Sequence, residues 1–145
     1  MEHPSTVALA VQWVSFAAFS FYPRKNLGAC GEAGAITTND TKKAQLLRSM
    51  RDWGQEGKGN HANPGFNYRM DGLQGAILGI KLKHLNEWTE ARNRVATLYR
   101  ELLEGEERIT LPSLRSGAAH SYHIFAVLKP ERDRIANEMR KAGIG

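Results

Sequence analysis

The chain has 145 residues, of which 41% are hydrophobic and 24% are charged. A chain of this length forms one ordinary domain, and its composition argues against a disordered protein. The formal net charge is +5, but the basic residues are spread along the sequence and form only short doublets. This distribution argues against a protein that binds nucleic acid, and an anionic cofactor or substrate accounts for the same charge excess.

The sequence does not indicate secretion or insertion into a membrane. A single cysteine, Cys30, excludes an internal disulfide framework and suits a reducing compartment. The apolar stretch 7–21 has no preceding basic residue, which a signal peptide needs. It is also shorter than the roughly 20 apolar residues of a membrane-spanning helix, and Gln12 interrupts it. We therefore expect a cytoplasmic protein with no membrane partner.

The first predicted elements are two short strands. Residues 17–22 (AAFSFY) predict a strand that ends at Pro23, and residues 35–38 predict a second strand. Glycines punctuate the segment between them, at positions 28, 31 and 34, which indicates a turn-rich loop. The sequence therefore predicts that a glycine-rich loop connects the two strands.

A helix is expected after the second strand. Asn39-Asp40 is a typical helix N-cap, and Ala44, Leu47 and Met50 then fall on one face of a helix that reaches about Trp53. Residues 55–65 are polar and glycine-rich, which predicts a long loop.

The rest of the chain predicts further helices and one more strand. Residues 70–103 have a helical pattern with a break expected near Trp88-Thr89. Residues 121–128 predict a strand, and residues 131–142 predict a final helix followed by Gly143. Strands interleaved with helices predict an α/β fold.

Lys25 is the candidate for chemistry in the segment SFYPRKNLG, residues 20–28. It follows a strand expected to be buried and enters a glycine-rich loop through a proline. We expect a lysine held there to be partly desolvated, which favours the neutral amine that forms a Schiff base. Ser20, on the same segment, offers a hydroxyl group that can bind a phosphate.

The motif SFxPxKNLG, followed by GExGA and TND, resembles the cofactor-lysine segment of the DegT/DnrJ/StrS family. The members of this family are sugar aminotransferases that depend on pyridoxal phosphate (PLP) and have the aspartate-aminotransferase fold. Residues 65–76 (GFNYRMDGLQGA) are similar to the family's segment before its long helix. Further similar segments follow the family's order: WGQ at 53–55, YHIF at 122–125 and MRKAGIG at 139–145.

The resemblance implies a division of the chain into parts of a longer enzyme. Residues 17–88 would be the end of the large PLP-binding domain. Residues 89–145 would be a linking helix and the start of a small α+β C-terminal domain. Residues 1–16 fit the family poorly, and no function is assigned to them. The family's aspartate that pairs with the pyridine nitrogen is not found in the chain, so we expect the isolated 145 residues to lack transaminase activity.

The resemblance also implies roles for individual residues. Lys25 would bind PLP covalently and then carry a proton between the substrate carbon and the cofactor. Ser20 would contact the cofactor phosphate, and Asn67 would reach the phosphate of the neighbouring subunit in a homodimer. Arg69 is interpreted as a structural residue that fixes the loop. His123 is a weaker candidate for a substrate contact, and a histidine packed in a strand is the alternative.

The function implied for the parent protein is transfer of an amino group, with glutamate as the expected donor, to a nucleotide-linked keto sugar. The product would serve polysaccharide, lipopolysaccharide or antibiotic synthesis. One alternative is a sugar dehydratase of the same family, but those enzymes have histidine in place of the lysine, so Lys25 argues against it. The other alternative is a non-catalytic fragment or interaction module. The histidines lack the spacing of metal ligands, so no metal is expected.

Overall fold

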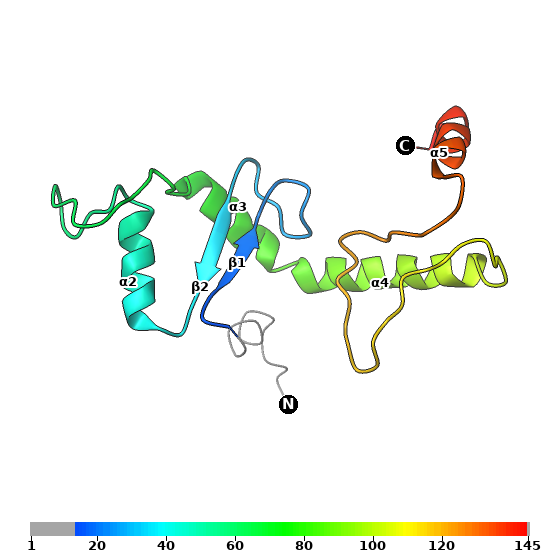
Figure 1. The fold of residues 1–145 in the computed structure, drawn as a ribbon, viewed down its shortest axis with the longest axis horizontal. Coiled ribbons are helices and arrows are strands. Elements are labelled where there is room, and N and C mark those ends of the chain that lie inside the picture. The colour runs from blue at the N-terminus through cyan, green and yellow to red at the C-terminus, as the bar shows by residue number, and fades with distance from the viewer. Residues whose placement is uncertain (1–13, 145) are drawn as a thin grey trace. The chain divides into compact units, whose positions relative to one another are not determined.

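A computed structural model describes residues 14–144 and divides the chain into two compact units (Figure 1). The first unit ends at His84, and the second begins at Leu85. Of the expected N-terminal segment 1–16, residues 1–13 lie outside the described part of the chain.

The first unit contains an antiparallel hairpin of β1 (Ala17–Ser20) and β2 (Gly34–Thr37). The register pairs Ala17 with Thr37 at one end and Ser20 with Gly34 at the other. Beyond this last pair, the backbone N–H of Phe21 donates to the carbonyl oxygen of Ala33 at 2.8 Å. Both predicted strands are therefore confirmed, although β1 ends at Ser20 rather than at Tyr22 and β2 begins and ends one residue earlier than expected. The glycine-rich segment between them forms the hairpin loop.

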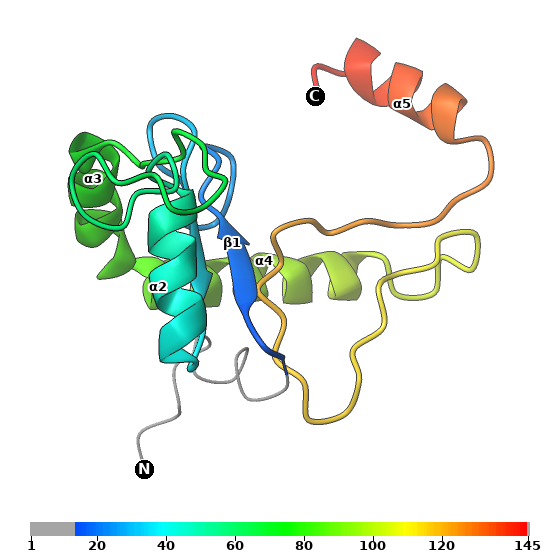
Figure 2. The same cartoon turned by 60° about the vertical axis from the view of Figure 1, so that its left-hand side comes forward.

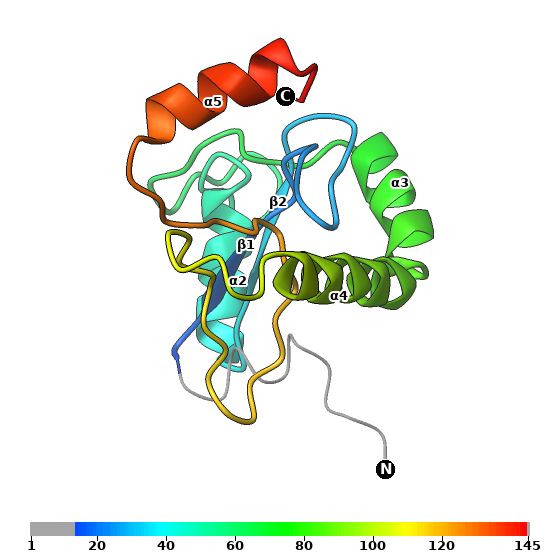
Figure 3. The same cartoon turned by 90° about the vertical axis from the view of Figure 1, so that its right-hand side faces the viewer.

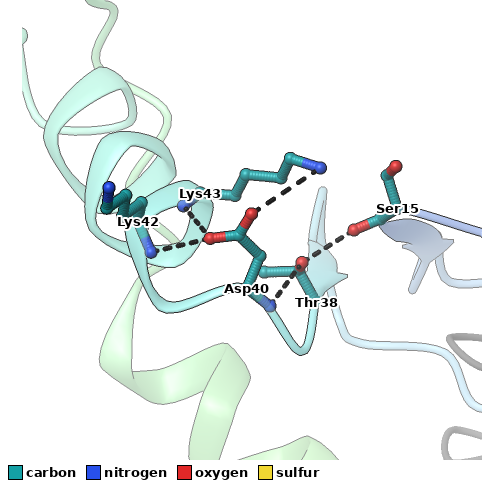
Figure 4. Close-up of polar contacts among 5 residues, drawn as sticks. All are labelled: Ser15, Thr38, Asp40, Lys42 and Lys43. Carbon is teal, nitrogen blue, oxygen red and sulfur yellow. Dashed lines mark hydrogen bonds and ion pairs between the residues drawn. The ribbon is translucent and has the colours of Figure 1, made fainter.

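Helix α2 (Thr41–Met50) follows β2 through a turn that the predicted N-cap residue fixes. A carboxylate oxygen of Asp40 accepts hydrogen bonds from the backbone N–H groups of Lys42 and Lys43, at 2.9 and 3.1 Å (Figure 4). The Thr38 hydroxyl accepts the N–H of Asp40 and donates to the carbonyl oxygen of Ser15. These contacts satisfy N–H groups that the first turn of a helix leaves without partners.

The expected extension of α2 to Trp53 is wrong, because the helix ends at Met50. Asp52 forms an isolated antiparallel bridge with Asn67, and Trp53 has a φ of 58°. A left-handed φ is incompatible with a right-handed helix, so the chain turns away from the helix axis there. The segment that leads from this turn to α3 passes over the C-terminal end of α2 (Figure 2).

The predicted helix over 70–103 is two helices, α3 (Gly72–Leu82) in the first unit and α4 (Leu85–Leu102) in the second. The expected break near Trp88-Thr89 is misplaced. The Thr89 hydroxyl donates to the Leu85 carbonyl oxygen at 2.8 Å, a bond that a continuous helix accommodates. The break lies at Lys83-His84, whose N–H groups bond to the third residue before each of them.

In the second unit, the irregular segment after α4 packs on that helix. Ala96 and Tyr122 are buried, and the Tyr99 and Phe125 rings stack with centroids 5.4 Å apart. The strand expected over 121–128 is wrong, since the described residues of this segment form only a single bridge, between Leu128 and Thr110. A strand needs a partner along its length, and Tyr122 has a φ of 41°, which interrupts an extended backbone.

The final helix, α5 (Arg132–Lys141), confirms the prediction, and Gly143 follows it with a φ of 76° (Figure 3). This left-handed conformation is the usual way to end a helix at glycine. Between residues 14 and 144, none of the helices combines the length and the apolar character that crossing a membrane requires.

The caps of α2 and α3 provide a matched test of local stability. Asp40→Ala removes two cap hydrogen bonds, so we expect it to lower the free energy of unfolding by about 1 kcal/mol. Asp71→Ala is the control, because Asp71 occupies the N-cap of α3 without a side-chain cap bond. Urea denaturation would measure both variants, and equal losses would contradict the assigned role of Asp40.

The turn after α4 contains a carboxylate whose ionisation is shifted. Arg108 lowers the pKa of Glu106 from 4.5 to about 2, first through side-chain hydrogen bonds at 2.8 Å and then through its backbone N–H. Because the folded-state pKa is depressed, this contact stabilises the fold above the unfolded-state pKa, and its contribution is lost as the pH falls towards 2.

We expect Arg108→Ala to raise the titration midpoint of Glu106 towards 4.5, as followed by NMR, because it removes the side-chain donors that favour the carboxylate. Arg115→Ala, with another exposed arginine of the same unit, should leave the midpoint unchanged. A midpoint that stays near 2 in Arg108→Ala would contradict this explanation.

Candidate functional site

Lys25 lies in the hairpin loop between β1 and β2, whose residues 21–31 we call the lysine loop. The N–H of Lys25 donates to the Tyr22 carbonyl oxygen at 2.8 Å, which forms a tight turn around Pro23. The N–H of Ala29 donates to the Phe21 carbonyl oxygen, also at 2.8 Å. This second bond closes residues 22–28 into a ring with Lys25 between its two arms.

Gly28 is required for this closure. A Cβ atom at this position would lie 2.3 Å from the carbonyl oxygen of Pro23 and 3.0 Å from that of Tyr22. Real Cβ atoms do not approach backbone oxygens to 2.3 Å, so any larger residue would push the two arms apart. Gly28 and Ala29 are also buried, so the base of the loop is packed and closed to water.

The Lys25 side chain is half-buried, and its ammonium group has no hydrogen-bond or ion-pair partner among residues 14–144. Several exposed cations of the chain have partners; for example, Lys141 and Arg134 pair with nearby glutamates. A lysine without a carboxylate partner is available for reaction with an aldehyde. The structure therefore places a primary amine without an ion-pair partner on a loop that backbone hydrogen bonds close, and its role in chemistry stays a prediction.

Ser20 is the last residue of β1 and lies directly before the lysine loop. Its hydroxyl oxygen accepts the N–H of Tyr22 at 3.3 Å, which orients the side chain towards the start of the loop. A hydroxyl group has one proton to donate, and the proton of Ser20 has no acceptor in the described chain. Ser20 therefore offers a hydroxyl donor at the end of β1, five residues before the amine of Lys25.

Helix α3 makes two side-chain contacts with the far arm of the lysine loop. The Gln74 side-chain oxygen accepts the N–H of Cys30 at 2.8 Å, and the Lys81 ammonium donates to the Gly28 carbonyl oxygen. The sequence analysis gave neither residue a role. One feature of the sequence could have indicated these contacts. Gln74 and Lys81 are polar residues in the otherwise apolar sequence of α3, and their spacing of seven positions places them on the same face of the helix.

Asn67 lies outside the lysine loop, on a segment attached to the C-terminal end of α2. The N–H groups of its two neighbours, Phe66 and Tyr68, donate to the carbonyl oxygens of Met50 and Arg51, at 2.7 and 2.9 Å. The Asn67 side chain is exposed, and no partner for its amide is found within residues 14–144. No hydrogen bond joins it to Ser20 or Lys25 of the same chain.

Arg69 supports this segment through an ion pair with Asp52, the residue whose backbone forms a bridge with Asn67. The pair agrees with the interpretation of Arg69 as a structural residue that fixes the loop. Both side chains are partly exposed, so the pair adds little stability by itself. Its effect is to hold the two backbones in register beside Asn67.

His123 belongs to the second unit, where its side chain is exposed and its backbone lies outside any strand. The alternative of a histidine packed in a strand is therefore wrong. Its neighbour Tyr122 is the buried residue, held by a hydrogen bond from Arg92 to its carbonyl oxygen at 3.3 Å and by a ring contact with His120. Nothing in the second unit assigns a binding role to His123.

Gly28→Ala tests the closure of the lysine loop. Forcing a methyl group against the Pro23 carbonyl should cost about 1–3 kcal/mol of folding free energy. Gly79→Ala is the matched control, because a Cβ atom on Gly79 in α3 would meet nothing within 4 Å, and alanine favours a helix. Thermal unfolding would compare the two, and a Gly28→Ala variant as stable as Gly79→Ala would disprove the closed loop.

The model of the DegT/DnrJ/EryC1/StrS aminotransferase family matches residues 10–145. The match includes residues 10–16, which lie in the segment expected to fit the family poorly. Among curated relatives, the erythromycin biosynthesis sensory transduction protein EryC1 of Saccharopolyspora erythraea is 40% identical over 128 residues, which are 88% of this chain and 35% of that protein. A dTDP-3-amino-3,4,6-trideoxy-alpha-D-glucose transaminase of Streptomyces venezuelae is 39% identical over 90% of this chain and 34% of its own length.

Solved structures give the same result. DesV of S. venezuelae, in complex with a ketimine intermediate, superposes with a TM-score of 0.87 at 38% identity, over 90% of this chain and 35% of that one. NtdA of Bacillus subtilis, with bound cofactor PMP, has a TM-score of 0.77 at 32% identity, over 90% of this chain and 31% of its own.

These likenesses confirm the predicted α/β fold as part of an aminotransferase fold. The chain spans about a third of the length of the relatives that it matches. Because the family model covers almost all of its residues, the chain belongs to the DegT/DnrJ/EryC1/StrS aminotransferase family.

Proposed function

We propose that the protein carrying this chain is a PLP-dependent aminotransferase that transfers an amino group from glutamate to a nucleotide-linked keto sugar. The observation that carries the proposal is the amine of Lys25, which has no partner and lies on a closed loop whose base is buried. The chain that carries it belongs to an aminotransferase family. The names of relatives support the substrate class, among them a UDP-N-acetyl-3-dehydro-alpha-D-glucosamine 3-aminotransferase of Acidithiobacillus ferrooxidans, 35% identical over 87% of this chain.

The residues present fit the cofactor. PLP carries an aldehyde and a phosphate, and the segment offers a free primary amine at Lys25 and a hydroxyl proton without an acceptor at Ser20. Lys25 would hold the aldehyde carbon, and Ser20 would donate a hydrogen bond to a phosphate oxygen. When bound, PLP supplies an electron sink for the carbon that gains or loses a proton.

Lys25 would then act as the acid–base group of the reaction. With the cofactor and substrate bound, the amine of Lys25 would carry a proton between the substrate carbon and the cofactor. A general base works only if it is held within hydrogen-bonding reach of that proton. The closed lysine loop provides this constraint, because its backbone position is fixed on both arms.

Asn67 would serve a second subunit in a homodimer. Its exposed amide has no partner in its own chain, and the segment that carries it is anchored to α2. We propose that this amide donates to the cofactor phosphate of the neighbouring subunit. We further propose that residues 17–88 complete the large domain, that residues 89–145 begin the small one, and that the enzyme works in the cytoplasm.

Reductive trapping tests the proposal on the protein carrying residues 1–145, expressed with the sequence that flanks it in its gene. Incubation with PLP and then borohydride should leave a phosphopyridoxyl group on the peptide that contains Lys25, because its amine is unpartnered. Peptide mass mapping would locate the group. Lys25→Ala should abolish the label and glutamate-dependent amination of keto sugars, whereas Lys83→Ala, at the end of α3, should leave both intact.

Two results would overturn the proposal. A label on another lysine would remove the role of Lys25, and a protein that takes up no PLP would remove the proposed activity altogether.

A further inference from the structure

Helix α3 is connected to the lysine loop by two side chains that lie on the same face of the helix. Gln74 and Lys81 are separated by seven residues, which is about two turns. They bond to Cys30 and Gly28, 44 and 53 residues away in the sequence. Both contacts are made to the backbone of the loop, so they fix its path rather than the rotamer of one side chain.

The two contacts flank the point where the loop is most tightly packed. Ala29, between the two bonded residues, has only 2% of its surface exposed and makes the bond that closes the loop. A Cβ atom on Gly31 would lie 3.0 Å from the Gln74 amide nitrogen, so this amide is packed directly against the backbone. Helix α3 therefore holds the returning arm of the loop, while β1 holds the outgoing arm.

We propose that Gln74 and Lys81 are positioning residues for Lys25. By fixing residues 28–30, they set the distance between the two arms and with it the place of the Lys25 amine relative to Ser20. This inference rests on the proposed function, because the position of Lys25 has a chemical consequence only if the lysine binds the cofactor. Lys81 itself is occupied by the Gly28 carbonyl oxygen, so it does not compete with Lys25 for an aldehyde.

Paired substitutions separate the hydrogen bonds from the bulk of these side chains. Gln74→Met and Lys81→Met keep the length of each side chain but remove the acceptor and the charged donor. Gln74→Glu keeps the oxygen acceptor, and Lys81→Arg keeps the charged donor. Gln45→Met in α2 and Lys83→Met after α3 are matched controls, because both side chains are exposed and neither forms a hydrogen bond with the lysine loop.

The first measurement needs no cofactor. Hydrogen exchange in the cofactor-free protein should become at least about tenfold faster at the amides of residues 28–30 in both methionine variants, because lost contacts let the loop open locally. The amides of α2 should keep their rates, and the Glu and Arg variants should restore protection. Exchange that is unchanged, or faster to the same extent throughout the chain, would overturn the proposal.

The second measurement uses PLP. In the methionine variants, we expect kcat to fall about tenfold with a smaller change in KM, because a displaced Lys25 would affect proton transfer more than substrate binding. Values equal to those of the controls would overturn the positioning role. Absence of label at Lys25 in the unmodified protein would instead reject the proposed function, and the exchange measurement would still decide whether α3 holds the loop.

Discussion

The hydrogen bond between the Ala29 N–H and the Phe21 carbonyl oxygen holds the two arms of the lysine loop together. It can form only because Gly28 lacks a Cβ atom that would collide with Pro23. Closure fixes the backbone on both sides of Lys25, and Ser20 lies directly before the closed loop. The acid–base role proposed for Lys25 depends on that closure, since an amine on a mobile loop would not be held near a substrate carbon.

Local signals in the sequence predicted the elements around the site. The presence of both hairpin strands and the Asp40 cap were correct, because these features depend on neighbouring residues, although β1 ends at Ser20 and not at Tyr22 as expected. The strand over 121–128 was wrong, because a strand depends on a partner that a local pattern does not reveal. The two hydrogen bonds between α3 and the lysine loop were missed for the same reason, since they join residues that are 44 and 53 positions apart in the sequence.

The two parts of the first unit that carry the proposed cofactor residues are stabilised in different ways. The lysine loop is held internally by backbone closure and externally by α3. The segment of Asn67 is held by backbone bonds to the end of α2 and by the pair of Arg69 with Asp52. The Lys25 side chain is half-buried, whereas the Asn67 side chain is exposed, which agrees with the proposed contact of Asn67 with a second subunit.

A crystal structure of the protein grown with PLP would test the central claim most directly. The account predicts continuous electron density between the Lys25 side-chain nitrogen and the cofactor, with the phosphate within hydrogen-bonding distance of the Ser20 hydroxyl and the lysine loop closed by the Ala29–Phe21 bond. A cofactor joined to a different lysine, or bound away from an open lysine loop, would contradict it.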